Sequence, residues 1–424
     1  MATGGARRAY LDHASSSPLR PAALEAMLPW LREPGDPGRV HAEGRAARVA
    51  LEEAREQVAA FFGARPREVI FTSGGTEAVN TAIHGAAARA AANRRSSPGM
   101  ERKTNAGWEG AGAADQPAFL RPDMAAEARR FEGDGAAVHI VTTAVEHSAV
   151  LEAANRAGRV TMAGVDRQGR FDAATVLAGI GPDTALVSVQ LANHEVGTLQ
   201  PAGEVVAGAR ERGVLVHVDA CAAAGHVPVD FAALDADLCS VTAHKLGGPR
   251  GIGALLVRRG LRLPPFLLGG AQERDRRAGI ENVAAAVGFA AAVTELAGDG
   301  LVGEAERCRA LTDRLLAETP KLVDGITVFG DPDGRLPHLV CFGVEGVEAE
   351  PVLLGLDQRG VAVHSGSSCS SETFEPSPVL KAMGVDADHS LRVSVGWSST
   401  AEDVDAFLAV LPDVVARLRR LGTG

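Results

Sequence analysis

His244 and Lys245 stand between a strand-like apolar run, residues 236–243, and a glycine-rich turn, residues 246–253. A lysine at such a junction is partly removed from water and held still by the turn. Burial lowers the pKa of a lysine amine, and the neutral amine can form a Schiff base with a carbonyl group. Lys245 is therefore a candidate for covalent attachment of a carbonyl cofactor, which would need further polar groups from other parts of the chain.

Asp219 ends another apolar run, residues 214–218, and precedes Lys245 by 26 positions. The carboxyl ends of parallel strands are where folds of this kind bind ligands. A carboxylate there can keep the nitrogen of a pyridine ring protonated, which makes the ring an electron sink. The alternative is an aspartate that only caps a loop.

Gly75 and Thr76 lie between an expected strand at residues 68–72 and an expected helix from Thr76 to about Arg89. Free backbone N–H groups at a helix N-terminus bind phosphate, and the Thr76 hydroxyl adds a donor. The same residue types also suit a turn with a helix cap. By itself this segment leaves both interpretations open.

Two further expected strands end in polar side chains. His147 follows the strand at 137–142 and could stack on a ring or move protons, whereas Asn193 follows the strand at 184–190. Each could be structural on its own. Usable groups at the ends of four separate strands, together with the buried-looking lysine, indicate a pyridoxal-phosphate site.

The C-terminal part carries a second cluster. Cys369 lies in a loop of serines and glycines at residues 364–373, where exposure and flexibility would suit a nucleophile. An ordinary exposed cysteine is the alternative; Cys239 and Cys341 lie in apolar strands and are expected in the core. Arg392 lies within an apolar strand and needs an anionic partner, which a substrate carboxylate would provide.

The composition is that of a globular enzyme. The chain has 424 residues, enough for two or three domains, with 46% hydrophobic and 23% charged residues. A net charge of -10 argues against a nucleic-acid binder, and no apolar run reaches the roughly 18 residues of a membrane span. Five irregularly spaced cysteines argue against a disulfide scaffold, and the N-terminus lacks a secretory signal. We expect a cytoplasmic protein that binds neither nucleic acid nor a membrane.

Short β-rich runs alternate with helical patterns up to about Pro264, which predicts an α/β fold with a mostly parallel sheet buried on both faces. Beyond Pro264, long helices and a few strands predict a smaller α+β domain. The expected strands are 68–72, 137–142, 184–190, 214–219, 236–243, 253–257, 326–329 and 339–343, and the expected later helices are 282–296 and 304–318.

The predicted division places residues 16–263 in the large domain and residues 1–15 with 264–424 in the small domain, which carries the Cys369 loop. Residues 91–135 are rich in Ala, Gly, Pro and Arg and show no sustained periodicity. A connection of a few residues would suffice between the flanking helix and strand. We therefore expect a disordered or weakly helical insertion there.

With these residues in place, the chain resembles the cysteine desulfurases, which are class V, fold-type-I pyridoxal-phosphate enzymes. The resemblance runs in family order along nearly the whole chain outside the insertion. Its matching segments are Tyr10–Ser15, Val40–Gly44, Val69–Glu77, Glu146–His147, Asn193–Gly197, His217–Ala220, Thr242–Lys245, Gly248–Gly253, Gly269–Glu273, Arg277–Gly279, Ser365–Cys369, Glu375–Ser377 and Leu391–Ser394.

The resemblance implies a role for each candidate residue. Lys245 would be the Schiff-base lysine, Asp219 the partner of the pyridine nitrogen, and His147 the stacking and proton-transfer residue. Cys369 would take the sulfur as a persulfide, and Arg392 would hold the substrate carboxylate. The remaining positions would bind the phosphate (Gly75, Thr76, Thr242 and His244) or lie near the cofactor hydroxyl or substrate (Asn193).

The family also implies a reaction and partners. The reaction converts L-cysteine to L-alanine, and the persulfide sulfur passes to an acceptor for iron–sulfur clusters, thiolated tRNA or another thio-cofactor. The spacing from Cys369 to Glu375–Ser377 is similar to that of the branch with the longer catalytic loop, which hands sulfur directly to scaffold or carrier proteins. A homodimer is a further expectation of the resemblance.

Three positions depart from the family pattern. Ala222 stands where a glutamine usually lies beside the cofactor oxygen, Ile280 where a threonine usually reaches the partner subunit's phosphate, and Trp397 where a basic residue is usual. The first two changes each remove a hydrogen bond of about 0.5–1.5 kcal/mol. Weaker cofactor binding is expected, while the residues of the chemistry itself are all present.

Two other functions stay open from the sequence. The chain could catalyse a related reaction, as a selenocysteine lyase, cysteine sulfinate lyase, aminotransferase or epimerase. It could also be a weakly active paralogue that serves mainly as a partner-binding scaffold, since Ala222 and Ile280 remove cofactor contacts.

Overall fold

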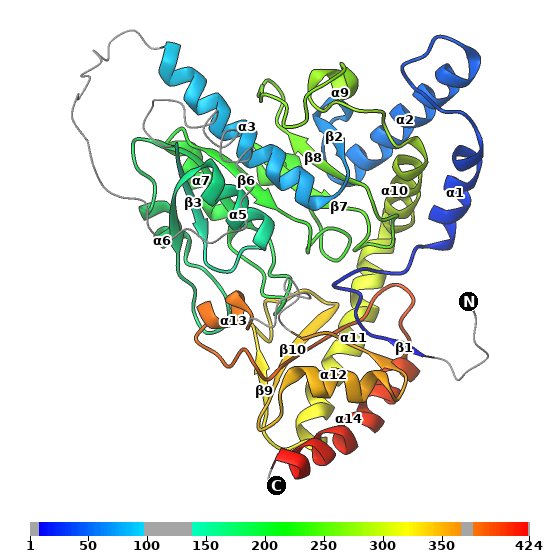
Figure 1. Cartoon of the computed structure of the whole chain (residues 1–424), viewed down its shortest axis with the longest axis vertical. Helices are drawn as coiled ribbons and strands as arrows, with labels where there is room; N and C mark the ends of the chain where they lie inside the picture. The colour runs from blue at the N-terminus through cyan, green and yellow to red at the C-terminus, as the bar shows by residue number, and fades with distance from the viewer. Residues whose placement is uncertain (1–7, 97–137, 366–375, 423–424) are drawn as a thin grey trace, which may run out of the picture.

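A computed structural model describes residues 8–96, 138–365 and 376–422 and contains two lobes (Figure 1). The larger lobe is built on a seven-stranded sheet of order β2-β8-β7-β6-β5-β3-β4, in which only β8 runs against the other strands. The mostly parallel sheet is thus confirmed. Its strands are β2 (Val69–Thr72), β3 (Val138–Thr143), β4 (Gly158–Ala163), β5 (Thr184–Gln190), β6 (Leu215–Asp219), β7 (Leu238–Thr242) and β8 (Gly253–Val257).

Both faces of this sheet are covered by helices, and for that reason its strands are continuous apolar runs. In β5, Leu186 packs on one face with helices α3 (Gly75–Ser96) and α5 (Ser148–Ala157). The neighbouring Val187 packs on the opposite face. The helices of that face are α2 (Ala42–Phe61), α6 (Ala173–Ala178), α7 (Ala202–Glu211) and α10 (Val283–Leu296).

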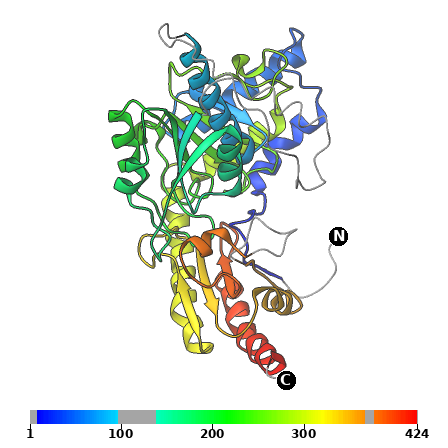
Figure 2. The same cartoon turned by 60° about the vertical axis from the view of Figure 1, so that its left-hand side comes forward.

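The smaller lobe has its own sheet and core (Figure 2). Strands β9 (Ile326–Phe329), β10 (Leu339–Val344) and β12 (Ser390–Ser394) form an antiparallel sheet of order β12-β10-β9. Two short strands, β1 (Ala9–Tyr10) and β11 (Val361–Ala362), pair in parallel beside it. The helices of this lobe are α11 (Asp299–Leu322), α12 (Ala349–Asp357), α13 (Pro378–Ala382) and α14 (Ala401–Gly422).

The first strand, β1, therefore joins the C-terminal part of the chain through β11. The predicted grouping of residues 1–15 with the small domain stays a prediction. The boundary at 263/264 stays a prediction. The buried side chains of α10, such as Phe289, belong to the core of the large sheet rather than to that of the small lobe. Four further elements complete the described fold: α1 (Pro21–Arg32), η1 (Pro66–Glu68), α8 (Phe231–Leu234) and α9 (Gln272–Asp275), with α1 packed against α10.

Several element boundaries differ from the prediction. Helix α3 continues to Ser96, seven residues beyond the expected end at Arg89, so residues 91–96 are helical rather than part of an insertion. The rest of the predicted insertion lies outside the described residues. Strand β4 was not predicted because it lies at the sheet edge, where its half-exposed residues interrupt the apolar pattern.

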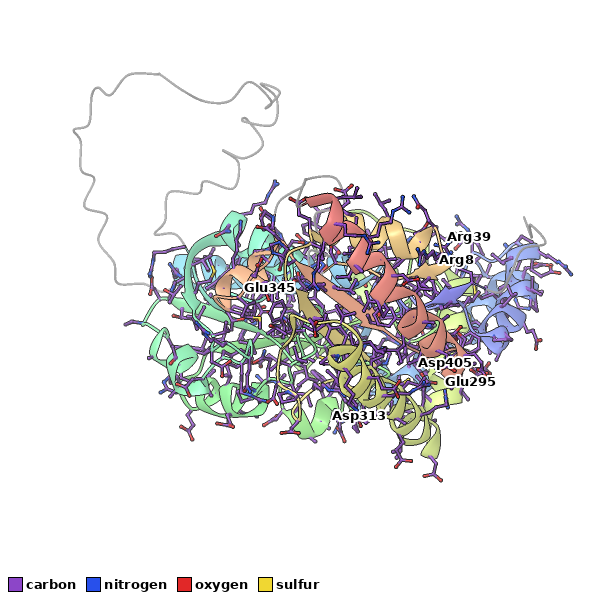
Figure 3. The ribbon with its side chains drawn as sticks, turned by 90° about the horizontal axis from the view of Figure 1, so that it is seen from below. Arg8, Arg39, Glu295, Asp313, Glu345 and Asp405 are labelled. Atoms are coloured by element: carbon purple, nitrogen blue, oxygen red, sulfur yellow. The ribbon has the colours of Figure 1, made fainter. Side chains whose placement is uncertain are left out.

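The charged residues lie mainly on the outside of the fold (Figure 3). Asp313 and Asp405 illustrate this, with more than half of each side chain exposed although each pairs with an arginine. Among the described residues, no single helix has the length and apolar composition of a membrane span; α10 and α11 meet that test only when joined across their 75° bend.

Candidate active site

A pocket opens at the carboxyl ends of the central strands, where the end of β7 and the start of α3 approach one another. Seven of the predicted site residues line it, so the tertiary structure brings together groups from positions 75 to 245. The lining residues are Gly75, Thr76, Val79, His147, Ala149, Gln190, Ala192, His194, Asp219, Cys221, Ala222, Thr242, His244 and Lys245.

One end of the pocket can receive an anion. Helix α3 begins at Gly75 and presents the backbone N–H groups of its first turn there. Thr242, the last residue of β7, is buried, and its Oγ1 has no hydrogen-bond partner within the described parts of the chain. A Cβ at Gly75 would lie 2.6 Å from Cys221 Sγ, so only glycine lets the helix start this close to β6. These groups suit a phosphate.

Lys245 is held by a tight turn directly after β7. The N–H groups of Leu246 and Gly248 both donate to the carbonyl of Ala243, at 3.2 and 2.9 Å. Gly247 has a φ of +87°, and a Cβ there would lie 2.7 Å from the Arg20 side chain. The turn therefore fixes the backbone that carries the Lys245 amine at the pocket wall.

His244 faces the same pocket and is neutral at pH 7. Burial, together with the charges of Lys245 and Arg250, lowers the pKa of its imidazole to about 4. A neutral imidazole can donate one hydrogen bond to a phosphate without adding a second positive charge beside the lysine.

Asp219 ends β6 between two parallel neighbours and is 8% exposed. Its Oδ1 accepts a hydrogen bond from the Cys221 N–H at 2.9 Å. Beneath it, His217 is fixed by the hydroxyls of Ser188 and Ser240, each at 2.8 Å, and burial lowers the pKa of this imidazole to about 4. A neutral histidine below the site leaves the Asp219 carboxylate available to a cation or N–H donor in the pocket.

His147 is the N-cap of α5, where its Nδ1 accepts the N–H of Ala149 at 3.0 Å. The neutral ring therefore carries its proton on Nε2. The ring meets His194 edge-on, with 5.2 Å between centroids. This orientation offers the pocket an aromatic surface and an N–H donor.

Glu146 lies fully buried beside the site. Burial raises the pKa of its carboxyl to about 8, an effect that hydrogen bonds from the Thr143 hydroxyl (2.5 Å) and the Gln190 N–H (3.1 Å) reduce. Glu146 is thus mainly protonated at neutral pH, so that Asp219 has no second negative charge close to it.

Asn193 does not line the pocket. Its Oδ1 accepts the N–H groups of Glu195 and Val196 at 2.8 and 2.9 Å, and its Nδ2 donates to the Val145 carbonyl at 3.1 Å. In this structure the carboxamide holds the loop after β5. The predicted contact with cofactor or substrate stays a prediction.

Arg392 lies in β12 of the small lobe, 1% exposed, and also outside the pocket lining. Its anionic partner in this structure is Asp12, whose Oδ1 accepts from Nη2 at 3.0 Å. Nη2 also donates to Ser15 and Nη1 to the His194 carbonyl, whereas Nε has no hydrogen-bond partner among the described residues. A substrate carboxylate would have to share or replace Asp12.

The predicted nucleophile, Cys369, lies outside the described residues. The described segment that precedes Cys369 lies beside Arg392. The backbone groups of His364 and Arg392 exchange two hydrogen bonds of 2.7 and 3.2 Å. The four described cysteines, at 221, 239, 308 and 341, are all buried with free thiols, and burial raises the pKa of each of them. None of these four suits an exposed sulfur acceptor.

The three departures have different surroundings. Ala222 lines the pocket and offers it no hydrogen-bond donor. Ile280 is 63% exposed, away from the pocket lining. Trp397 has a structural role instead of a charge, since its indole N–H donates to the Pro18 carbonyl at 2.8 Å and the Arg20 guanidinium lies over its ring.

Gln190, His194 and Cys221 also line the pocket but were not among the predicted site residues. Gln190 could have been found by the rule that selected Asp219, because it is the last residue of an apolar strand of the same parallel sheet. Taken together, the lining offers an amine, a carboxylate at strand end β6, an aromatic ring and a phosphate-binding helix start. This set fits pyridoxal phosphate.

Comparison with known proteins agrees with this geometry. The family model for class-V aminotransferases matches residues 9–96 and 126–407. The chain is 41% identical to an IscS-like cysteine desulfurase of Mycobacterium tuberculosis, with 97% of each chain covered. It is 37% identical to cysteine desulfurase IscS of Dictyoglomus turgidum over 98% of this chain and 96% of that one. Among solved structures, a NifS-like protein superposes with a TM-score of 0.80 at 29% identity, covering 97% of this chain and all of that one.

Proposed function

We propose that the thiol of Cys369 accepts the sulfur that this chain removes from L-cysteine. The chain belongs to the class-V aminotransferase family and is a pyridoxal-phosphate-dependent cysteine desulfurase. The observation that supports the activity most directly is one pocket lined by Lys245, Asp219 and the start of α3. These groups come from separate elements and meet only in the folded chain.

Pyridoxal phosphate, when bound, supplies a carbonyl carbon for the substrate amine and a pyridine ring that accepts electrons from the substrate Cα. The chain holds it with four sets of groups. Lys245 Nζ would provide the covalent attachment, and Asp219 would keep the ring nitrogen protonated. The backbone at Gly75 and Thr76, with Thr242 and His244, would bind the phosphate, and His147 would cover one face of the ring.

Lys245 moves the substrate proton. The Lys245 side chain lines the pocket, and its Nζ, as a neutral amine, would take the proton from the substrate Cα. The neutral His244 beside it does not compete for that proton, because burial holds its pKa near 4. The proton on His147 Nε2 is a second mobile proton at the pocket.

Sulfur transfer to Cys369 needs no external oxidant. The Cys369 thiolate forms a bond with the substrate sulfur while the substrate carbon–sulfur bond breaks. The electron pair of that bond stays with the carbon, which takes up a proton and becomes the methyl group of alanine. One cysteine and one enzyme thiol therefore give one alanine and one enzyme persulfide, with all atoms accounted for.

The test is an L-cysteine assay of the cofactor-loaded protein that measures alanine and sulfide together. Lys245→Ala should abolish both products, because proton transfer at Cα loses its base. Cys369→Ser should abolish desulfuration of L-cysteine. If Cys369→Ser kept full activity, the persulfide step would be wrong and a lyase that needs no cysteine, such as a cysteine sulfinate or selenocysteine lyase, would be favoured.

The destination of the sulfur is also a proposal. Two of the relatives are named IscS or IscS-like cysteine desulfurases. We expect a scaffold or carrier protein to take the persulfide sulfur for iron–sulfur clusters, a thio-cofactor or thiolated tRNA. Loading the enzyme with ³⁵S-cysteine and trapping labelled acceptor proteins would identify it; label that stays on the enzyme would count against direct transfer.

A homodimer in the cytoplasm is the expected state of the enzyme. Free buried thiols at all four described cysteines are consistent with a reducing compartment. Light scattering of the purified protein would measure the mass, and a monomer at micromolar concentration would contradict the dimer.

A further inference from the structure

Gln190 has a buried side-chain amide and lines the pocket, and its Nε2 donor has no hydrogen-bond partner among the described residues. Gln190 ends β5 and is 3% exposed. A buried donor without a partner costs about 1–3 kcal/mol, so such a group calls for a ligand or an explanation.

The two neighbouring amides show that this is specific to Gln190. Asn193, three residues later, uses both its oxygen and its nitrogen in the loop after β5. Gln200 accepts the Phe171 N–H at 3.2 Å and donates to the Gly169 carbonyl at 2.7 Å. Of these three amides, Gln190 alone lines the pocket.

The sheet register places Gln190 level with Asp219. The two residues are direct partners in the parallel pair β5–β6, and residues at one level of neighbouring strands point to the same face. Both line the pocket. The Gln190 side chain therefore lies at the level of the sheet where Asp219 would meet the pyridine ring.

A missing contact lies close by. Ala222 also lines the pocket. The resemblance to the cysteine desulfurases implies a glutamine beside the cofactor oxygen at this position. Alanine has no donor to offer. Gln190 supplies a carboxamide to the same pocket from the adjacent strand.

Only one acceptor on the cofactor is open to such a donor. The phosphate oxygens would lie with the start of α3, Thr242 and His244, and the ring nitrogen would be protonated by its contact with Asp219 and could not accept. The phenolic oxygen remains. Resting on the proposed function, we propose that the Gln190 carboxamide donates a hydrogen bond to the phenolic oxygen of pyridoxal phosphate and so replaces the glutamine that is absent at position 222.

The test measures cofactor binding without any substrate. Protein stripped of cofactor is titrated with pyridoxal phosphate, or with the analogue that lacks the 3-hydroxyl group, and binding is followed by visible absorbance. Gln190→Leu should weaken pyridoxal-phosphate binding by about 2- to 12-fold, the loss of one neutral hydrogen bond. It should leave binding of the analogue unchanged, because the analogue has no phenolic oxygen.

Restoration gives the second arm. Adding Ala222→Gln to Gln190→Leu should recover most of the affinity for pyridoxal phosphate. The affinity for the analogue should again stay unchanged. Gln200→Leu is the matched control: it removes a buried amide outside the pocket and should lower thermal stability while leaving the dissociation constant of the folded protein unchanged.

Two results would overturn the inference. Gln190→Leu could bind pyridoxal phosphate as tightly as the wild type, or it could lose equal affinity for the cofactor and the analogue, which would make Gln190 a structural residue. Failure of the proposed function looks different, because the wild-type protein itself would then bind no pyridoxal phosphate.

Discussion

Two buried arginines, Arg55 in the large lobe and Arg392 in the small lobe, each form an ion pair with a carboxylate. They differ in how many of their guanidinium nitrogens have a hydrogen-bond partner. Arg55 is 2% exposed and Arg392 1%. Arg55 has every nitrogen engaged, whereas Arg392 keeps an Nε without a partner among the described residues. The saturated arginine supports the fold, and the unsaturated one is suited to exchange partners.

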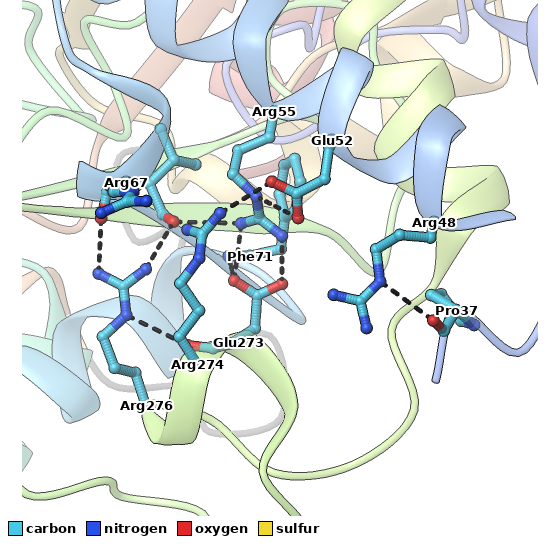
Figure 4. A network of polar contacts seen from close by, with 10 residues as sticks. Pro37, Arg48, Glu52, Arg55, Arg67, Phe71, Glu273, Arg274 and Arg276 are labelled. Carbon is cyan, nitrogen blue, oxygen red and sulfur yellow. Dashed lines mark hydrogen bonds and ion pairs between the residues drawn. The ribbon is translucent and has the colours of Figure 1, made fainter. Parts of the chain in front are cut away.

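Figure 4 shows Arg55, which forms a bidentate ion pair with Glu273. Nη1 and Nη2 donate to the two carboxylate oxygens at 2.7 and 2.8 Å, and the Phe71 N–H donates to the same carboxylate at 3.2 Å. The guanidinium also lies over the Phe71 ring.

This ion pair stabilises an unusual backbone. Glu273, Arg274 and Asp275 have φ values of +47°, +60° and +61°, a region that side-chain-bearing residues rarely occupy. Each such residue costs about 1–3 kcal/mol and persists only where its surroundings hold it. The buried pair between Arg55 and Glu273 is the contact that holds the first of the three.

The unsaturated case joins two segments that are distant in sequence. Arg392 holds Asp12 by a single guanidinium nitrogen, and the Asp12 side chain is 16% exposed. A carboxylate from a ligand could therefore use the remaining donors of Arg392 without removing a fully saturated contact. We therefore expect Arg392, which keeps an unused donor, to be the arginine of the two that binds a ligand carboxylate.

The largest effect is expected from Arg55→Leu. The change leaves the Glu273 carboxylate buried without its cation, so the free energy of unfolding should fall by about 3–5 kcal/mol. Chemical denaturation of the cofactor-loaded protein measures this loss. The kcat/KM of the protein that remains folded should change little, because Arg55 does not line the pocket.

The double variant Arg55→Leu with Glu273→Leu is the control. Removing both charges avoids the unpaired carboxylate, so a large part of the lost stability should return. A double variant as unstable as Arg55→Leu alone would show that packing rather than the ion pair stabilises this region, and the contrast with Arg392 would lose its basis.

Arg392→Ala should act on substrate binding. Loss of one charged hydrogen bond worth about 1.5–3 kcal/mol should lower kcat/KM for L-cysteine by roughly 10- to 150-fold, mostly through KM. Steady-state kinetics measure the split between kcat and KM. Arg392→Lys keeps the charge but not the fork and should recover only part of the loss.

Asp12→Asn tests whether Asp12 competes with substrate for Arg392. It removes the competing charge and should leave KM for L-cysteine equal or lower. A KM that rises as far as in Arg392→Ala would mean that Asp12 orients Arg392 for the substrate instead of occupying its place.

The smallest effect, counted for one unit of pH, concerns Glu146, a buried carboxyl that accepts hydrogen bonds from a hydroxyl and a backbone N–H. Burial raises its pKa from 4.5 to about 8 in the folded protein. Between these two pH values the folded state keeps a proton that the unfolded state has released. The contribution of the Glu146 carboxyl to the free energy of unfolding is therefore fully present below pH 4.5 and is lost as the pH rises towards 8.

Glu146→Gln keeps the shape of the side chain without this titration. The difference in unfolding free energy between Glu146→Gln and the wild type should grow by about 1.4 kcal/mol for each unit of pH within that window. Denaturation at a series of pH values measures it. A difference that is constant with pH would show that Glu146 is ionised in the folded protein and, like Glu273, has a cation nearby.

The sequence predicted most of the pocket because each residue obeys a local rule. Asp219 and His147 follow apolar runs, Lys245 stands between an apolar run and a glycine-rich turn, and Gly75 precedes a helix. Parallel strands bring their carboxyl ends to one edge of a sheet, so an inference from each strand separately also places the residues together.

Boundaries and contacts between distant segments were less accessible. Strand β4 escaped because an edge strand with exposed residues lacks the continuous apolar run of a central strand. The sequence predicts that Arg392 needs an anion, for which it offers a substrate carboxylate. Its partner in the fold, Asp12, lies 380 positions away, and no local pattern in the sequence connects the two.

By itself the sequence predicted the α/β class, the positions of most strands and seven of the residues that line the pocket, because periodicity and strand-end position are local properties of the chain. Only the tertiary structure decided how the polar groups are used. It assigns Asn193 to a loop, leaves Gln190 with an unused donor and separates Arg55 from Arg392 by the saturation of their hydrogen bonds. Those outcomes depend on which groups meet across the fold, and hydrogen bonds form only between atoms that the packing brings within reach.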